Sequence, residues 1–195
     1  MSHKNNKKVV LFASGSGSNA QKICEYFQNH EKIKVTNLYC NNAKALVLEK
    51  AKAFGIDSTL FDKIDLLDSD KVLEDLERIE PDLIVLAGFL LKIPKKITDK
   101  FPNKIINIHP ALLPKFGGKG MYGINIHSAV VKKNEKKTGI SIHYVNEKYD
   151  EGANIFQKET TVNKNETPEA LSKRVLKMEH EFFSKTIEKI LSDEK

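Results

Sequence analysis

The chain has 195 residues, of which 40% are hydrophobic and 30% are charged, with a formal net charge of +6. This length allows one domain with a sizeable core and makes a second full domain improbable, and the composition excludes a disordered chain. The longest apolar stretch, residues 83–91, is too short to cross a bilayer, and residues 1–8 lack the apolar segment of a signal peptide, so we expect a cytoplasmic protein.

The positive charge is spread over the chain. Lysines alternate with acidic residues, and the densest patch, residues 132–137, contains no aromatic residue. This distribution favours a solvated lysine-rich surface over a nucleic-acid interface, although a modest positive field would attract an anionic small substrate. Cys24 and Cys40 form no metal-ligand pattern and require no disulfide, and the dispersed histidines lack ligand spacing, so we expect no metal site.

Short apolar runs alternate with helical patterns along the first three quarters of the chain. The runs rich in Val, Ile and Leu predict strands at residues 9–13, 33–39, 83–87, 104–109 and 139–145. Helices are predicted between them, at residues 19–28, 43–54, 69–79, 94–100 and 125–132. This alternation indicates a Rossmann-like α/β fold, with a mostly parallel sheet, right-handed crossovers and helices on both faces. Ligands of such sheets bind beyond the carboxyl ends of the strands.

The last part of the chain has a different character. Residues 154–162 predict one more strand, which we expect to be antiparallel to the strand before it. Thr167 and Pro168 are typical of a helix start, and four apolar residues at helical spacing follow as one stripe, namely Leu171, Val175, Met178 and Phe182. A long final helix should therefore pack on the sheet. We see no internal repeat and no linker, so residues 1–195 are treated as a single domain.

A glycine-rich segment, residues 13–20, follows the first strand and opens the first helix. Gly17 lets the backbone approach a ligand, and the amides at the helix N-terminus, with the side chains of Ser18 and Asn19, favour a phosphate. The segment also satisfies the dinucleotide pattern G-x-G-x-x-A, and it can be read as a plain tight turn. The dinucleotide interpretation requires an acidic residue after the second strand, where the chain has asparagines at 41 and 42. We therefore favour a phosphomonoester.

A second group of polar residues follows the predicted strands near the middle of the chain. Asn107 and His109 stand at a strand end, and Asp150 lies in a turn after the next strand. An Asn amide can donate to a developing oxyanion, and a carboxylate beside an imidazole favours its protonated form. Taken singly, a strand-end histidine is more often a satisfied core residue, and Asp150 with Gly152 more often marks a turn. His143 is a possible further partner, although a core role is the more usual one.

Five motifs together resemble the phosphoribosylglycinamide formyltransferases. They are Ser-Gly-x-Gly-Ser-Asn at 14–19, Leu-Ala-Gly-Phe at 86–89, Asn-Ile-His-Pro-Ala-Leu-Leu-Pro at 107–114, Thr-Gly at 138–139 and Asp-Glu-Gly at 150–152. The resemblance covers nearly the whole chain except residues 1–7, which we expect to be a disordered leader. It implies the formyltransferase fold and transfer of a formyl group from 10-formyltetrahydrofolate to the amine of glycinamide ribonucleotide, a step of de novo purine synthesis.

The resemblance also assigns roles to residues of this sequence. It implies that Asn107 and His109 stabilise the tetrahedral intermediate, and that Asp150 keeps His109 protonated and assists proton transfer through water. The ribonucleotide would be bound at its phosphate by Gly17, Ser18 and Asn19, and at its glycinamide end by Glu179. The folate would be bound by Leu90, Leu91, Lys92, Ile93, Asn107, Val145 and Glu147. The folate is a co-substrate, so no tightly bound cofactor is implied.

Some positions depart from the family or stay open. Many relatives carry Arg where this chain has Leu91, and Leu176 stands where relatives often carry a polar substrate contact. A basic residue that reaches the folate in relatives aligns near Lys71. Residues 116–123 form a glycine-rich segment that is either a plain connection or a lid, in which Lys119 would approach the phosphate.

Related enzymes share the Asn, His and Asp set. Methionyl-tRNA formyltransferase adds a C-terminal barrel for tRNA and formyltetrahydrofolate deformylase adds an N-terminal regulatory module, and we expect neither in this chain. A nucleotide-binding or tRNA-binding module without catalysis is the alternative from another class. We expect small-molecule substrates, no nucleic acid, no membrane, and a monomer or homodimer.

Overall fold

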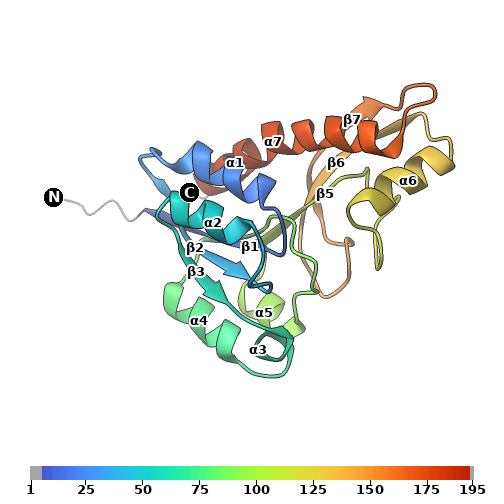
Figure 1. Ribbon diagram of the computed structural model, residues 1–195. Coiled ribbons are helices and arrows are strands. Elements are labelled where there is room, and N and C mark those ends of the chain that lie inside the picture. The colour runs from blue at the N-terminus through green and yellow to red at the C-terminus, as the bar shows by residue number, and fades with distance from the viewer. Residues whose placement is uncertain (1–5, 194–195) are drawn as a thin grey trace.

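The computed structural model describes residues 6–193 and shows one sheet with helices on both faces (Figure 1). In this part of the chain the strands are β1 (Lys7–Ala13), β2 (Ile33–Cys40), β3 (Asp57–Leu60), β4 (Leu83–Leu86), β5 (Ile105–His109), β6 (Lys137–Tyr144) and β7 (Asn154–Thr161). The helices are α1 (Ser18–Phe27), α2 (Val47–Ala53), α3 (Lys63–Leu67), α4 (Lys71–Ile79), α5 (Lys95–Lys100), α6 (Ile124–Lys132) and α7 (Pro168–Asp193).

The sheet has the strand order β3-β2-β1-β4-β5-β6-β7. Strands β1 to β5 pair in parallel, which confirms the predicted α/β class. Strand β6 is antiparallel to β5, and β7 is antiparallel to β6. We expected one antiparallel strand at the C-terminal side of the sheet, and the structure has two. Because β6 runs against β5, its last residues lie beside the first residues of β5.

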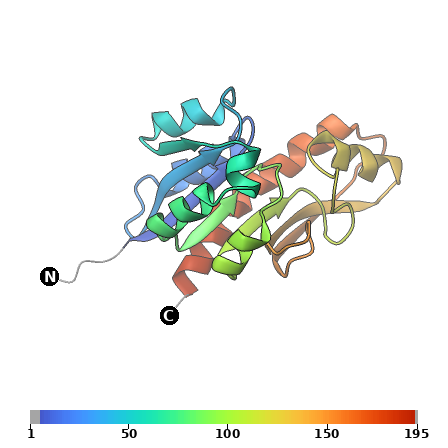
Figure 2. The ribbon, with the colours of Figure 1, turned by 90° about the horizontal axis from the view of Figure 1, so that it is seen from below.

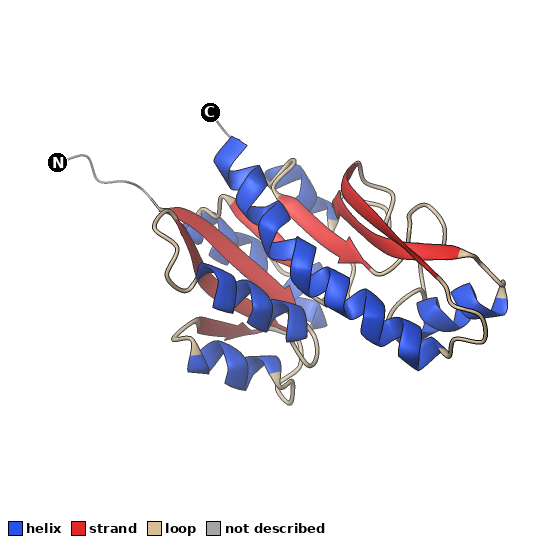
Figure 3. Cartoon of the chain, turned by 90° about the horizontal axis from the view of Figure 1, so that it is seen from above, coloured by secondary structure: helices blue, strands red, loops and turns tan. Residues whose placement is uncertain are grey.

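Alternating side chains of β1 enter two separate cores. Val9 and Leu11 belong to the core between the sheet and the face that carries α1, α2, α6 and α7, whereas Val10 and Phe12 belong to the core under α3, α4 and α5. Figure 2 shows this second group of helices, and Figure 3 shows α7 lying along the opposite face. Every residue of β4 is buried, as expected for a central parallel strand covered on both sides. Two covered faces leave the strand ends as the place for a ligand.

The long final helix begins as the sequence predicts. The Thr167 hydroxyl oxygen accepts a hydrogen bond from the Ala170 backbone N–H at 3.2 Å, so Thr167 acts as the N-cap. Leu171 and Val175 are fully buried, and Met178 packs against the same core. This stripe holds α7 on the sheet and thereby positions its polar residues.

The structure differs from the sequence prediction at β3, α3 and α2. Strand β3 is a short edge strand with the polar sequence Asp-Ser-Thr-Leu, so it lacks an apolar run. Helix α3 begins with a capping box between Asp62 and Asp65, which is a local signal that the apolar periodicity did not reveal. Helix α2 begins at Val47 because the Asn42 side chain accepts from the Lys44 N–H at 3.0 Å and turns the chain first.

The predicted leader, residues 1–7, lies outside the described residues up to position 5. Lys7, however, is the first residue of β1, and its ammonium group lies 3.0 Å from the Asp82 carboxylate. Among the described residues, none of the helices combines the length and the apolar character that a membrane crossing requires.

A glycine of β6 that pairs with β7 generates the first prediction. A methyl group at Gly139 would overlap the Lys158 carbonyl on β7, so Gly139→Ala must push two paired strands apart. We expect this variant to lower the free energy of unfolding by about 1–3 kcal/mol, measured by urea denaturation. Gly15→Ala is the control, because a methyl group there meets no atom within 4 Å. Equal stability of the two variants would contradict this account.

Candidate functional site

A cavity of about 440 Å³ opens beyond the carboxyl ends of β1, β4 and β5. Its wall combines segments that are far apart in the sequence: the start of α1, the loop after β4, the end of β5, the 118–123 loop, the start of α6, the segment after β6 and one face of α7. This is where a parallel sheet is expected to bind its ligand. The chain thus builds one large pocket from four of the five segments that carry the sequence motifs, and Thr138 and Gly139 lie outside its wall.

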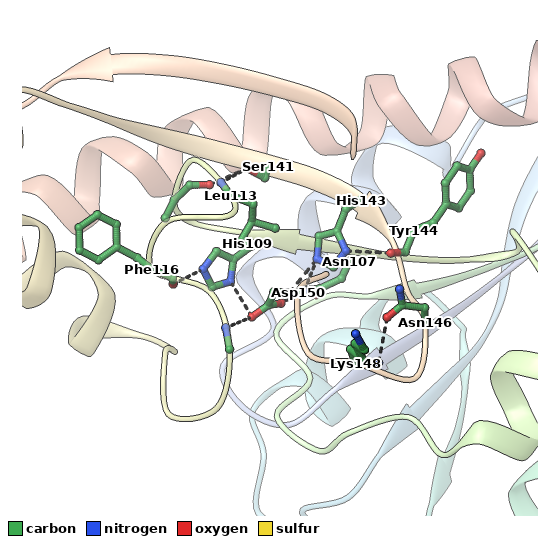
Figure 4. A network of polar contacts seen from close by, with 12 residues as sticks. Asn107, His109, Leu113, Phe116, Ser141, His143, Tyr144, Asn146, Lys148 and Asp150 are labelled. Carbon is green, nitrogen blue, oxygen red and sulfur yellow. Dashed lines mark hydrogen bonds and ion pairs between the residues drawn. The ribbon is translucent and has the colours of Figure 1, made fainter. Parts of the chain in front are cut away.

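The structure brings Asn107, His109 and Asp150 together at this cavity (Figure 4). Asn107 and His109 are two residues apart on β5, so their side chains project from the same face of the strand. One Asp150 carboxylate oxygen, Oδ2, lies 3.6 Å from His109 Nδ1, and the other, Oδ1, lies 3.5 Å from Asn107 Nδ2. Asp150 adopts a left-handed conformation (φ 55°), which belongs to the turn that directs its side chain inward.

His143 completes the group. The antiparallel register of β5 and β6 places it opposite Asn107, and its side chain is almost fully buried. His143 Nδ1 lies 2.9 Å from the Tyr144 carbonyl oxygen, so this nitrogen donates. His143 Nε2 lies 3.2 Å from the Asn107 amide nitrogen and 3.6 Å from Asp150 Oδ1. His143 consequently orients the Asn107 amide, which is the role of a further partner that the sequence left open.

The 116–123 loop is attached to the same residues through its backbone. The Phe116 carbonyl oxygen lies 2.8 Å from His109 Nε2, and the Gly118 N–H donates to Asp150 Oδ2 at 2.9 Å. Phe116 has a left-handed conformation (φ 58°), which is uncommon for a residue with a side chain. Lys119 is exposed and lines the cavity. The loop backbone thus holds the side chains of His109 and Asp150, and whether the loop is also a moving lid stays a prediction.

Burial and charge shift the two central titratable groups. Burial lowers the pKa of the His109 imidazole, and the Asp150 carboxylate and Phe116 carbonyl oppose this effect only in part. For Asp150, burial by itself would raise the pKa, but the contacts with His143, His109 and Gly118 together hold the pKa of this carboxyl below its usual range. Asp150 is therefore ionised at neutral pH and supplies the negative charge next to both histidines.

The glycine-rich segment after β1, which we predict to bind a phosphate, leads directly into α1. Gly17 adopts the left-handed conformation (φ 67°) and α1 begins directly after it, at Ser18. A methyl group at Gly17 would overlap Val47, so only glycine fits. Ser18 and Asn19 line the cavity, whereas Gly17 itself does not. After β2, the Asn41 amide oxygen accepts from the Ser14 hydroxyl at 2.7 Å, where a dinucleotide site would need a carboxylate free for a ribose.

Glu179 lies at the same cavity on α7. Its carboxylate is 8% exposed and accepts a hydrogen bond from the Asn19 amide nitrogen. Burial raises the pKa of Glu179 to about 7, because the contact with Asn19 compensates only partly for the loss of solvent. This contact joins the N-terminus of α1 to α7. Asn19 and Glu179 therefore lie close enough to bind one ligand, as the sequence predicts for both.

The predicted folate residues divide between the cavity and the surface. Six of them line the cavity, namely Leu90, Leu91, Lys92, Ile93, Asn107 and Val145. Glu147 is exposed and outside the cavity wall, and its role stays a prediction. Lys71 also lies outside the wall, where its ammonium group pairs with Asp65 at 2.9 Å.

Several cavity residues received no individual role from the sequence, and three of them are polar side chains of interest. Tyr149 is 41% exposed, and its ring lies 5.8 Å from the Lys92 ammonium group. His127 on α6 and Ser172 on α7 also line the cavity. Helical periodicity assigns such residues to a helix but does not say which element they face. Among residues 6–193, no group of three or more His, Cys, Asp or Glu is placed to hold a metal ion.

Burial of Glu179 makes stability depend on pH. Between its ordinary pKa of 4.5 and about 7, the folded protein binds a proton that the unfolded chain releases, so stability falls as pH rises through this window. The loss is on the order of 3 kcal/mol. Glu179→Gln cannot titrate, so its stability relative to wild type should increase from pH 4.5 to 7.5 in urea denaturation. A difference that stays constant with pH would contradict a buried, proton-binding Glu179.

Comparison with known proteins agrees with this site. The family model described as formyl transferase matches residues 7–187. A chloroplastic phosphoribosylglycinamide formyltransferase of Arabidopsis thaliana is 40% identical over 93% of this chain and 64% of its own length, and a second plant relative is covered over 62%. The chain therefore spans less than two thirds of these two relatives. The phosphoribosylglycinamide formyltransferase of Bacillus subtilis is 34% identical to this chain, and the match covers 95% of each of the two sequences.

The fold is also similar to solved structures. The crystal structure of phosphoribosylglycinamide formyltransferase from Anaplasma phagocytophilum has a TM-score of 0.87 and 32% identity, over 97% of this chain and 89% of that one. The corresponding enzyme of Bacillus halodurans has a TM-score of 0.87 and 30% identity, over 97% of both chains. Sequence and fold agree, and the chain belongs to the formyl transferase family.

Proposed function

We propose that this protein transfers the formyl group of 10-formyltetrahydrofolate to the amine of N1-(5-phospho-D-ribosyl)glycinamide (glycinamide ribonucleotide). The products are formylglycinamide ribonucleotide and tetrahydrofolate, in de novo purine (IMP) biosynthesis. The observation that carries the proposal is the grouping of Asn107, His109 and Asp150 on one cavity that also includes the start of α1. The relatives named phosphoribosylglycinamide formyltransferase support the same reaction.

The reaction needs a site for a negative charge on oxygen. The substrate amine attacks the formyl carbon, and the carbonyl oxygen becomes an oxyanion as the new C–N bond forms. The intermediate then collapses, the bond between carbon and folate N10 breaks, and the proton lost by the substrate nitrogen is delivered to N10. Groups that stabilise the oxyanion and move this proton are therefore the ones that accelerate transfer.

Asn107 can donate directly to the oxyanion. Its amide carries two hydrogens, and one is directed to His143 Nε2 at 3.2 Å. The other makes only the 3.5 Å contact with Asp150, which is at the limit of a hydrogen bond. This second hydrogen is therefore available to an oxyanion at little cost, and the bond to His143 keeps it aimed at the cavity.

His109 and Asp150 act as a pair. Both ring nitrogens of His109 face oxygen acceptors, the Phe116 carbonyl and the Asp150 carboxylate, and these acceptors favour the imidazolium that burial disfavours. An oxyanion beside the ring would shift the balance further toward the protonated form. Asp150 is ionised, so through a water molecule it can take the proton from the substrate nitrogen and pass it on.

The two substrates would occupy different parts of the cavity. The phosphate would bind at the N-terminus of α1, with Gly17, Ser18 and Asn19, and the glycinamide amine would be held by the Glu179 carboxylate. The folate would lie along Leu90, Leu91, Lys92, Ile93 and Val145. Where relatives carry Arg at the position of Leu91, Lys92 beside Tyr149 is the basic side chain that remains in this wall.

The same proposal leads to expectations about partners, cofactors and cellular location. Both substrates are small molecules, so we expect neither nucleic acid nor membrane as a partner. The folate leaves altered and is a co-substrate, and no tightly bound cofactor is needed. We retain the expectation of a cytoplasmic monomer or homodimer, while the Arabidopsis relative carries the word chloroplastic in its name.

The direct test follows the absorbance change on deformylation of a 10-formyl folate, with and without glycinamide ribonucleotide. We expect turnover that requires the ribonucleotide, and a loss of at least ~100-fold in Asn107→Ala or His109→Ala because the oxyanion loses its stabilisation. Retained thermal stability of both variants controls for folding. Turnover without the ribonucleotide would instead indicate a deformylase, and its complete absence would favour a binding module.

The charge coupling between Asp150 and His109 predicts a pH effect. Asp150→Asn removes the carboxylate that raises the pKa of His109, so the imidazolium should be lost at a lower pH than in the wild type. We expect lower turnover and a basic limb of the kcat/KM profile that is displaced toward acid. A variant whose profile coincides with that of the wild type would refute the coupling.

A further inference from the structure

His127 is a buried histidine without a hydrogen-bond partner. It lies in the first turns of α6, its side chain is 3% exposed, and it lines the cavity. Its Nδ1 is buried and unpaired, and no described residue accepts from or donates to its Nε2. By contrast, His30 contacts Glu188, and both His109 and His143 use two ring nitrogens in polar contacts. An unpaired imidazole on a cavity wall is therefore an exception that calls for a reason.

A second unpaired atom lies on the same cavity. The amide oxygen of Asn19 is buried and has no partner, although its amide nitrogen is bonded to Glu179. The two atoms belong to α1 and α6, and both helices pack against α7. Helix α7 contributes Ser172, Leu176 and Glu179 to the cavity, spaced four and three residues apart on one face and spanning ~10 Å along its axis. Figure 1 shows α7 running past both α1 and α6. His127 therefore continues the wall that begins with the Asn19–Glu179 contact.

The state of the imidazole limits what it can bind. Burial lowers the pKa of His127, and the nearby His109 lowers it further, so the ring is neutral at pH 7. A neutral imidazole has one donor and one acceptor and no charge to neutralise a phosphate. It suits an uncharged polar group, such as a sugar hydroxyl or a carboxamide.

We propose that His127 is a substrate-binding residue that hydrogen-bonds to the ribose or carboxamide of glycinamide ribonucleotide. This inference rests on the proposed function. It adds a residue that affects the affinity for the ribonucleotide and leaves the affinity for the folate unchanged. The ring gains a hydrogen-bond partner only when the ribonucleotide is bound, through Nε2, the ring nitrogen that is not fully buried. Two effects of opposite sign follow, because removing the imidazole removes an unpaired buried group from the free protein and a hydrogen bond from the complex.

The test compares three variants by calorimetric titration with glycinamide ribonucleotide and with a 10-formyl folate, and by thermal unfolding without ligand. His127→Phe should bind the ribonucleotide about tenfold more weakly and bind the folate as the wild type does. Its thermal midpoint should be unchanged or higher. His127→Gln keeps a donor and an acceptor and should retain most of the affinity. If the larger ring does not fit, His127→Leu carries the same expectations.

His180→Phe is the matched control. His180 also has a buried ring nitrogen without a partner, on α7, but it does not line the cavity. Its replacement should leave both affinities unchanged.

Each result has one meaning. Equal ribonucleotide affinity of the wild type and His127→Phe would overturn the inference while the proposed function stands. Equal weakening for both substrates would also overturn it, since that indicates a general distortion. A wild type that does not bind the ribonucleotide would overturn the proposed function, and the inference with it.

Discussion

The buried carboxylate of Asp150 is the constraint on which the site depends. Its side chain is 11% exposed, yet it remains ionised because polar groups approach it from three chain segments. His109 reaches it from β5, His143 from β6, and the Gly118 N–H from the glycine-rich loop. An ionised carboxylate in such a place is stable only while these contacts persist. One charge therefore fixes the relative positions of a strand end, its antiparallel neighbour and a loop.

The cavity contains a second buried carboxyl group with the opposite behaviour. Glu179 has one hydrogen-bond donor, Asn19, and burial raises its pKa to about 7, while the several donors around Asp150 hold the pKa of that carboxyl low. The two groups have the same chemistry and differ in the number of donors around them. A permanent negative charge belongs at the reacting atoms, where protons move. A carboxyl group that can be neutral in the empty protein and ionised beside a cationic amine suits the recognition of an amine.

The two ends of the cavity also differ in how well their polar groups are satisfied. Around Asn107 nearly every polar atom has a partner within the chain, so the chain itself maintains this geometry. On the wall formed by α1, α6 and α7, Asn19 and His127 each keep a buried atom without one. Under the proposed function, the first group is the catalytic part of the site, and the second is the part that gains contacts from the ribonucleotide.

The sequence by itself determined the class of fold and the long capped helix, because these depend on periodicity and on local capping at Thr167. From motifs, it also predicted a shared site for Asn107, His109 and Asp150, and the structure places these three residues on one cavity. The sequence did not reveal β3 or α3, since a short polar edge strand and a one-turn helix have no apolar period of their own. The partnership of His143 with Asn107 depends on the antiparallel register of β5 and β6, which pairs residues 36 positions apart. The raised pKa of Glu179 and the unpaired nitrogen of His127 likewise arise because distant helices bury these side chains. Burial and register are properties of packing between elements, and only the tertiary structure decides them.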